Sequence, residues 1–126
     1  MNFIKQLNIT IGRTLYETDI VLFRTLLDSK SLEKYEFADN RQLVMLAIGI
    51  LNRTLNLEGF LVAVVAQKWE FHREVSIGDT LSVAYQIQEN KDFSNNRFIY
   101  DIKIDLIVEE NLVAAGVWGI MLNSKL

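Results

Sequence analysis

The chain has 126 residues, half of them apolar, and a formal net charge of −3 at neutral pH. This length suits one domain, residues 1–126, that can bury a core without disulfides. The sequence has no cysteine, which excludes thiolate metal sites and a cysteine nucleophile. The acidic balance argues against a nucleic-acid-binding protein, which would need surplus Lys and Arg to contact phosphates.

The apolar segments are too short for a membrane protein. The first ten residues, MNFIKQLNIT, contain too short an apolar stretch for a secretory signal. The longest apolar run, residues 43–51, falls well below the roughly 20 residues that a membrane helix requires. We therefore expect a cytoplasmic protein that does not contact a membrane.

The first half of the chain predicts one short strand, QLNITIG, followed by helices. The segment YETDIVLFRTLL has helical periodicity, and Thr18 or Asp19 can cap its start. Its apolar face consists of Ile20, Phe23, Leu26 and Leu27. After a break at DSKS, Ser31 can cap a short helical turn that reaches Ala38.

The segment that follows DNRQ is apolar on every side, which is typical of a helix enclosed by other structure. We expect Leu46, Ile50 and Leu51 to be buried against a sheet. The helix trails into NRTLNLEG, and Gly59 is suited to end it.

Beyond Gly59 the apolar period changes to two. FLVAVVAQKWEF, residues 60–71, is rich in β-branched and aromatic residues and predicts a buried strand. Three further strands are predicted at residues 80–89, 97–108 and 112–122, joined by the turns IGD and ENLV. Consecutive long strands with short connections form an antiparallel meander, which gives about five strands around one enclosed helix.

Three stretches resemble one family. The opening IGRTLYETDIVLFRTLLD, the phrase FHREVSIGDTL and the helical LAIGIL are similar to segments of MaoC-like (R)-specific enoyl-CoA hydratases and dehydratases. In the second stretch, Glu74 stands where the family usually has proline. This resemblance implies an α+β hot-dog fold, in which a bent antiparallel sheet wraps around a central helix. It also implies an acyl thioester of CoA or acyl carrier protein as substrate.

The resemblance also assigns the candidate site. The family's catalytic loop, Gly-Asp-x-Asn-Pro-x-His, falls on LDSKSLE, so that Asp28 matches the aspartate and Glu33 stands at the histidine position. In the family's Ala-His-Gly stretch, Ile48 replaces the histidine and Gly49 is retained. The backbone amide of this glycine is the family's expected donor to the thioester oxygen, and Gly49 and Ile48 are therefore the candidate substrate-binding residues.

These replacements leave several functions open. Hydration or dehydration needs two groups with separated pKa values, and two carboxylates can share the task only if one is held protonated. Thioester hydrolysis by Asp28 and Glu33 needs less, since a carboxylate base or nucleophile with a backbone donor suffices. The third alternative is a non-catalytic hot-dog subunit or acyl-binding module. Glu33 could then be a first-turn helix residue, and Asp28 a helix cap or a partner of loop amides.

Other features predict partners rather than chemistry. Long strands leave exposed edges that a homodimer can cover, and a heterodimer with a second hot-dog chain is an alternative. His72 is the only histidine, so it cannot form a multi-histidine metal site, and we expect it at a rim. Trp69 and Trp118 are expected in the core or an interface. The sequence predicts no metal and no cofactor.

Overall fold

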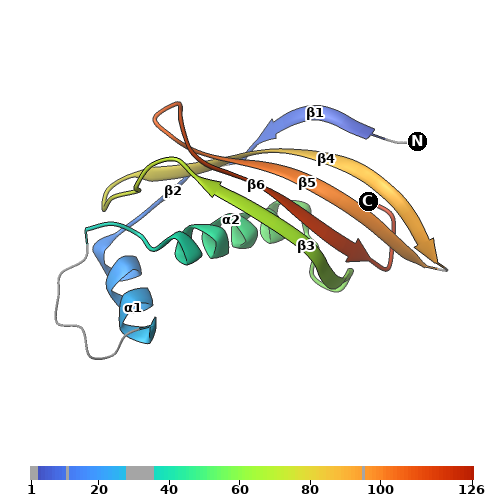
Figure 1. Ribbon diagram of the computed structural model, residues 1–126, viewed down its shortest axis with the longest axis horizontal. Coiled ribbons are helices and arrows are strands. Elements are labelled where there is room, and N and C mark those ends of the chain that lie inside the picture. Colours follow the sequence, from blue (N-terminus) through green and yellow to red (C-terminus); the bar gives the residue numbers. More distant parts are fainter. Residues whose placement is uncertain (1–2, 11, 28–35, 95) are drawn as a thin grey trace.

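The computed structural model describes residues 3–10, 12–27, 36–94 and 96–126 and contains a curved antiparallel sheet with two helices (Figure 1). In chain order the elements are β1 Phe3–Ile9, β2 Arg13–Thr14, α1 Glu17–Leu27, α2 Asn40–Leu55, β3 Leu61–Phe71, β4 Thr80–Ser94, β5 Arg97–Val108 and β6 Asn111–Leu122. No helix in the described part of the chain is long and apolar enough to cross a membrane.

The sheet has the strand order β1-β4-β5-β6-β3, and the two-residue β2 also pairs with β4. The meander β4–β5–β6 forms the centre of the sheet, as the sequence predicts. Strand β3 returns along the far side of β6, where Trp69 pairs with Gly116. The N-terminal strand closes the opposite edge, with Ile9 opposite Ala84 on β4.

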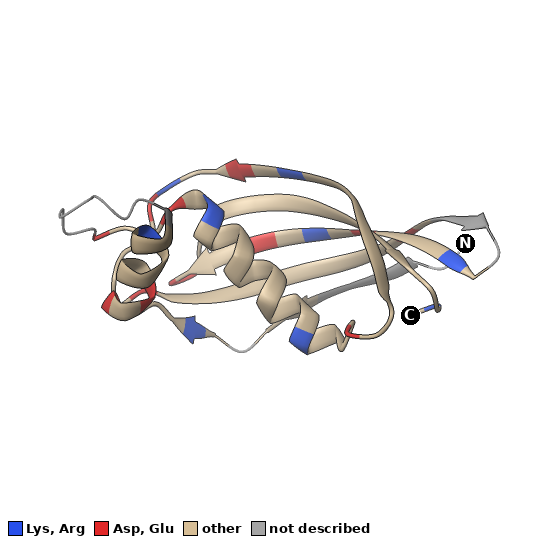
Figure 2. Cartoon of the chain, turned by 90° about the horizontal axis from the view of Figure 1, so that it is seen from below, with Lys and Arg blue, Asp and Glu red and all other residues tan. Residues whose placement is uncertain are grey.

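Helix α2 lies across the concave face of the sheet (Figures 1 and 2). Leu43, Ala47 and Leu51 lie on its sheet-facing side and are fully or almost fully buried. The alternating inward side chains of β5 meet them from the other side, and Ile102, Ile104 and Leu106 have at most 1% exposure. This arrangement confirms the expected α+β hot-dog architecture, and the described residues form six strands rather than about five.

Of the burial expected along α2, only that of Leu51 is confirmed in full, and the predicted end of the helix is wrong. Leu51 is fully buried, whereas Leu46 and Ile50 are only partly buried against the core. The helix ends at Leu55, and Asn56 adopts the left-handed conformation (φ 52°) that ends it. Gly59, the predicted terminator, also has a positive φ, but it lies in the connection to β3.

Helix α1 covers the core with less of its surface than its pattern predicts. Ile20 is fully buried, but Leu26 is 85% exposed, so the expected apolar face does not continue to the end of the helix. Asp19 does cap the start, although from inside the first turn, where its Oδ2 accepts a hydrogen bond from the N–H of Tyr16. The helical turn predicted from Ser31 to Ala38 falls mostly on residues 28–35, outside the described residues.

Strand β3 is not the buried strand that its apolar sequence predicts. Within the described chain it pairs with β6 alone, and Val62, Val64 and Val65 are 44–46% exposed. The strand formed as expected because β-branched residues favour extended backbone. The strand is not buried, because in the described chain no strand pairs with its second edge.

Candidate functional site

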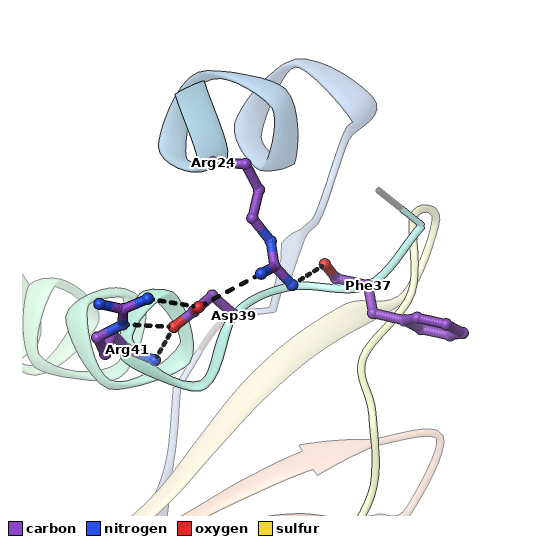
Figure 3. A network of polar contacts seen from close by, with 4 residues as sticks. All are labelled: Arg24, Phe37, Asp39 and Arg41. Atoms are coloured by element: carbon purple, nitrogen blue, oxygen red, sulfur yellow. Dashed lines mark hydrogen bonds and ion pairs between the residues drawn. The ribbon is translucent and has the colours of Figure 1, made fainter. Parts of the chain in front are cut away.

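A polar network holds the start of α2 against the end of α1 (Figure 3). Asp39 is the N-cap of α2, and its Oδ1 accepts hydrogen bonds from the backbone N–H and the Nε of Arg41, at 2.8 and 2.9 Å. Its Oδ2 lies 2.9 Å from Nη2 of Arg41 and 3.4 Å from Nη1 of Arg24. Arg24 also donates from Nη2 to the carbonyl oxygen of Phe37, at 3.2 Å. Two helices and the segment before α2 are thereby joined around one carboxylate.

This network sets the charge of Asp39. The side-chain hydrogen bonds from Arg41 are the largest cause that lowers the pKa of Asp39 to about 2, against the opposing effect of burial. The Arg41 amide and the charges of Arg41 and Arg24 lower it further. Asp39 therefore stays ionised at neutral pH and serves as a structural acceptor, since a carboxylate with so low a pKa holds no proton to donate there and is a weak base.

The network also brackets the candidate catalytic residues. Asp28 and Glu33 belong to residues 28–35, which lie outside the described residues. Arg24 precedes this segment and contacts Asp39 and Phe37, which follow it. The sequence did not predict this clamp, formed by Arg24 with Phe37 and Asp39. Asp39 directly before an apolar helix is a usual capping signal, but its pairing with Arg24 depends on tertiary structure.

The phrase IGDT forms a structural connection rather than a reactive group. Gly78 adopts a positive φ of 92° in a turn where the Asp79 N–H donates to the Ser76 carbonyl oxygen at 3.1 Å. Asp79 Oδ2 accepts from the Ser76 N–H at 2.8 Å. The N–H of Gly78 donates to the carbonyl oxygen of Leu15, and the N–H of Leu15 donates to that of Asp79. The turn thus fixes the segment that leads into α1.

Gly49 lies near the middle of α2 and has open space beside it. It is about 200° around the helix from the buried Ala47, so it faces away from the sheet. A Cβ built at Gly49 meets no described atom within 4 Å outside its own helix and neighbours. Because α2 is continuous through this position, the Gly49 N–H belongs to the helical ladder and would bond to the Met45 carbonyl oxygen. Gly49 therefore offers space to a ligand rather than a free amide donor.

Ile48 lies on a different side of α2. Gln42 donates from Nε2 to the Asp19 carbonyl oxygen at 2.9 Å, which places the Gln42 side of the helix against α1. Ile48 is on the opposite flank of the helix, and it is partly buried against the core. At the position of a family histidine, the chain thus has an apolar packing residue.

The remaining candidates are separate from this region of α2. His72 is exposed just after β3, where its N–H donates to the Val113 carbonyl oxygen at 2.8 Å. Trp118 is fully buried in the core, and Trp69 is half-buried and packs over Gly116. Among the described residues, no group of three or more His, Asp or Glu side chains could hold a metal ion.

Comparison with known proteins identifies similar structures but no similar sequence. No family model and no curated protein matches the chain. The MaoC-like dehydratase from Rhodospirillum rubrum superposes with a TM-score of 0.79 at 12% identity, over 98% of this chain and 94% of that one. The (R)-hydratase from A. caviae involved in PHA biosynthesis gives 0.71 at 13% identity, over 93% and 94%. The smu.793 protein from Streptococcus mutans UA159, bound to acetyl CoA, gives 0.61 at 14% identity, over 99% and 87%.

These similarities show that the chain has the hot-dog fold of the MaoC-like structures. They agree with the resemblance in the sequence. At such low identities they show the fold alone, because one fold supports many functions.

Proposed function

We propose that this chain binds an acyl thioester of CoA or acyl carrier protein beside α2, in a site of MaoC-like type. The observation that carries the proposal is Gly49. An interior helical glycine costs about 0.5–1 kcal/mol relative to alanine, and here no packing contact within the described chain requires it. Space for a ligand accounts for its presence. The structural neighbours support the ligand class, since two are a dehydratase and a hydratase and another holds acetyl CoA.

Gly49→Leu tests this site directly. Leucine favours helix, and the space beside Gly49 is open, so the variant should be at least as stable as the parent. It should weaken binding of butyryl-CoA by about tenfold or more, measured by titration calorimetry, since the leucine side chain then occupies the ligand's space. Met45→Leu is the matched control, because Met45 is exposed one turn earlier on the same face. Equal binding by the Gly49 variant would exclude Gly49 from the site.

In this proposal, any chemistry is carried out by Asp28 with Glu33. The pair can hydrate an enoyl thioester if one carboxyl is held protonated, or hydrolyse a thioester if one acts as base or nucleophile. Assays on enoyl-, 3-hydroxyacyl- and saturated acyl-CoA separate these reactions. We expect Asp28→Asn and Glu33→Gln both to abolish turnover, with Glu58→Gln, an exposed site after α2, as the control. If turnover is lost with Asp28→Asn but not with Glu33→Gln, Glu33 would have no part in catalysis and would be a helix residue.

A non-catalytic acyl-binding subunit is the second candidate, and Ile48 is the observation that favours it. An apolar side chain packed on the core replaces a family histidine, and Glu33 replaces the other. In this case the thioesters bind without turnover. Activity that appears only when a second hot-dog chain with an intact Asp and His is added would identify the heterodimer.

We also propose a homodimer that forms along β3. This strand is an edge of the described sheet, and three of its valines are 44–46% exposed. An unpaired edge with apolar side chains is a template for a second strand, and a two-fold axis would pair it with itself. Val64→Lys should convert the dimer to a monomer in sedimentation. Val21→Lys is the control, since Val21 is equally exposed on α1. A parent protein that sediments as a monomer at micromolar concentration would contradict the proposal.

A further inference from the structure

A groove lies on the flank of α2 opposite Ile48. It has a volume of about 640 Å³ and lies between the C-terminal half of α2 and the segment around β2. This volume is within the roughly 300–1,000 Å³ typical of small-molecule sites. Its lining consists of Ile9, Thr10, Gly12, Arg13, Ile50, Arg53 and Thr54. Since Ile48 and Gly49 are not among these residues, the groove is distinct from the site proposed above.

The strand side of the groove is held firmly against β4. Thr10 donates its N–H to the Val83 carbonyl oxygen at 2.9 Å, and its hydroxyl accepts from the Val83 N–H at 3.0 Å. A Cβ at Gly12 would lie 2.7 Å from Cγ2 of Thr80, so glycine lets the chain pass close to β4. Because this segment is drawn toward the sheet, space remains between it and α2.

The helix side supplies an apolar wall and a charge. Ile50 is partly buried on the flank of α2, and across the groove Ile9 is 67% exposed although it is apolar. The Thr54 hydroxyl donates back to the Ile50 carbonyl oxygen at 2.8 Å, so it does not offer its proton to the groove. An apolar chain could cover both isoleucines and remove this surface from water.

Among the described residues that line the groove, both charged groups are basic. Arg13 donates from Nη2 to Asp19 Oδ1 at 2.9 Å, while its buried Nη1 has no hydrogen-bond partner among the described residues. Arg53 is exposed in the last turn of α2 and forms no ion pair within the described chain. In a protein with a net charge of −3, two guanidinium groups beside apolar side chains are a local site for an anion.

We propose that this groove binds an anionic amphiphile, with an alkyl chain against Ile9 and Ile50 and a carboxylate or phosphate at Arg13 and Arg53. A free fatty acid and the phosphate-bearing end of an acyl-CoA share this chemistry. The inference does not depend on the acyl-thioester site, because none of its residues is common to both.

Titration with decanoate, monitored by the methyl NMR signals of the isoleucines, tests the groove. We expect saturable shifts at Ile9 and Ile50 below about 1 mM, with the buried Ile102 unaffected. Arg53→Gln should weaken binding by about tenfold, as expected for the loss of one charge-assisted contact. The matched control is Arg73→Gln, which removes an exposed charge outside the groove. Parallel titrations with decanol, CoA and decanoyl-CoA distinguish the alkyl chain from the two kinds of anion.

Each result decides the proposal. The proposal is supported if decanol binds more weakly than decanoate. It also requires that Arg53→Gln weaken decanoate binding and that Arg73→Gln leave it unchanged. Displacement of decanoate by CoA supports it with phosphate as the natural anion. Equal binding of decanol and decanoate, an equal effect of the two arginine substitutions, or no shift with any compound overturns it. Gly49→Leu should leave decanoate binding unchanged, which separates failure of this groove from failure of the acyl-thioester site.

Discussion

Strands β5 and β3 are both rich in apolar residues, yet the sheet treats them differently. On β5, Ile102, Ile104 and Leu106 are at most 1% exposed. On β3, Val62 and Val64 are 44% and 46% exposed. The first strand has a neighbour on each side and α2 across its inner face, whereas among the described residues the second has only β6. Apolar composition therefore predicts the strand, and the position in the sheet decides whether the strand is buried.

The two sequences do contain a signal of this difference. β5 alternates between apolar and polar residues from Tyr100 to Leu106, which is typical of a strand with one covered face. β3 begins with an unbroken apolar run, which suits cover on both faces. The part of the chain that the structure describes does not provide that cover. The second subunit proposed above would supply such cover for the apolar run of β3.

The largest expected effect compares one residue from each strand. Ile102→Ala should lower the free energy of unfolding by about 2–5 kcal/mol, because it leaves a cavity at a fully buried position. Val64→Ala should cost less than about 1 kcal/mol in the monomer, since nearly half of the side chain is already in water. Denaturant unfolding at low protein concentration measures both. Equal losses would mean that β3 is covered within the monomer and would break the comparison.

A second test examines where β3 is attached to the sheet. A Cβ on Gly116 of β6 would lie within 2.6 Å of Cδ2 of Trp69, so the indole of β3 occupies the space that the glycine leaves. Gly116→Ala should therefore destabilise the protein by about 1–3 kcal/mol through overpacking. Trp69→Leu in the same chain should recover part of this loss. If the two changes are simply additive in a double-mutant cycle, the contact does not carry the effect.

Much of the fold could be predicted because its periodicity is local. The alternation in residues 97–108 and the all-round apolar segment that contains Leu51 defined the central strand and the enclosed helix. The exposure of β3 and the last turn of α1 could not be predicted, because they depend on what lies opposite. The same holds for the clamp, since Arg24 and Asp39 are distant in sequence. The site was predicted from resemblance, and the structure adds the open space at Gly49 while Asp28 and Glu33 lie outside its described residues.

The third prediction contrasts the apolar sheet with the charged junction before α2. The pKa of Asp39 is lowered from 3.8 to about 2 by its bonds with Arg41 and the charge of Arg24. Its ionised form therefore stabilises the fold fully above pH 4, and this contribution is lost as the pH falls through about 2. Asp39→Asn keeps a capping acceptor but removes the charge, so it should cost about 1–2 kcal/mol at pH 6, roughly half as much at pH 3, and little at pH 2 or below.

Unfolding curves at several pH values measure this difference. Asp39→Ala serves as the comparison, because it also removes the cap and should retain a residual cost of about 1 kcal/mol at low pH. An Asp39→Asn cost that stays constant between pH 6 and pH 3 would contradict the charge-based explanation. Ile102→Ala should show little change over the same range, since no charged group contributes to its burial.

The smallest effect concerns the turn that joins β5 to β6. Glu109 and Glu110 form a two-residue hairpin between the paired Val108 and Asn111, with φ of 49° and 66°. Positive φ at both central positions is the type I′ geometry, which favours Asn-Gly, and left-handed backbone is costly for glutamate. Replacing the pair by Asn-Gly should therefore raise the free energy of unfolding by about 0.5–1 kcal/mol. A Gln-Gln variant removes both charges and retains the backbone cost, so it should gain at most a few tenths of a kcal/mol. Equal gains in the two variants would assign the effect to charge repulsion rather than to the backbone, and the turn would then contribute no strain to the central hairpin.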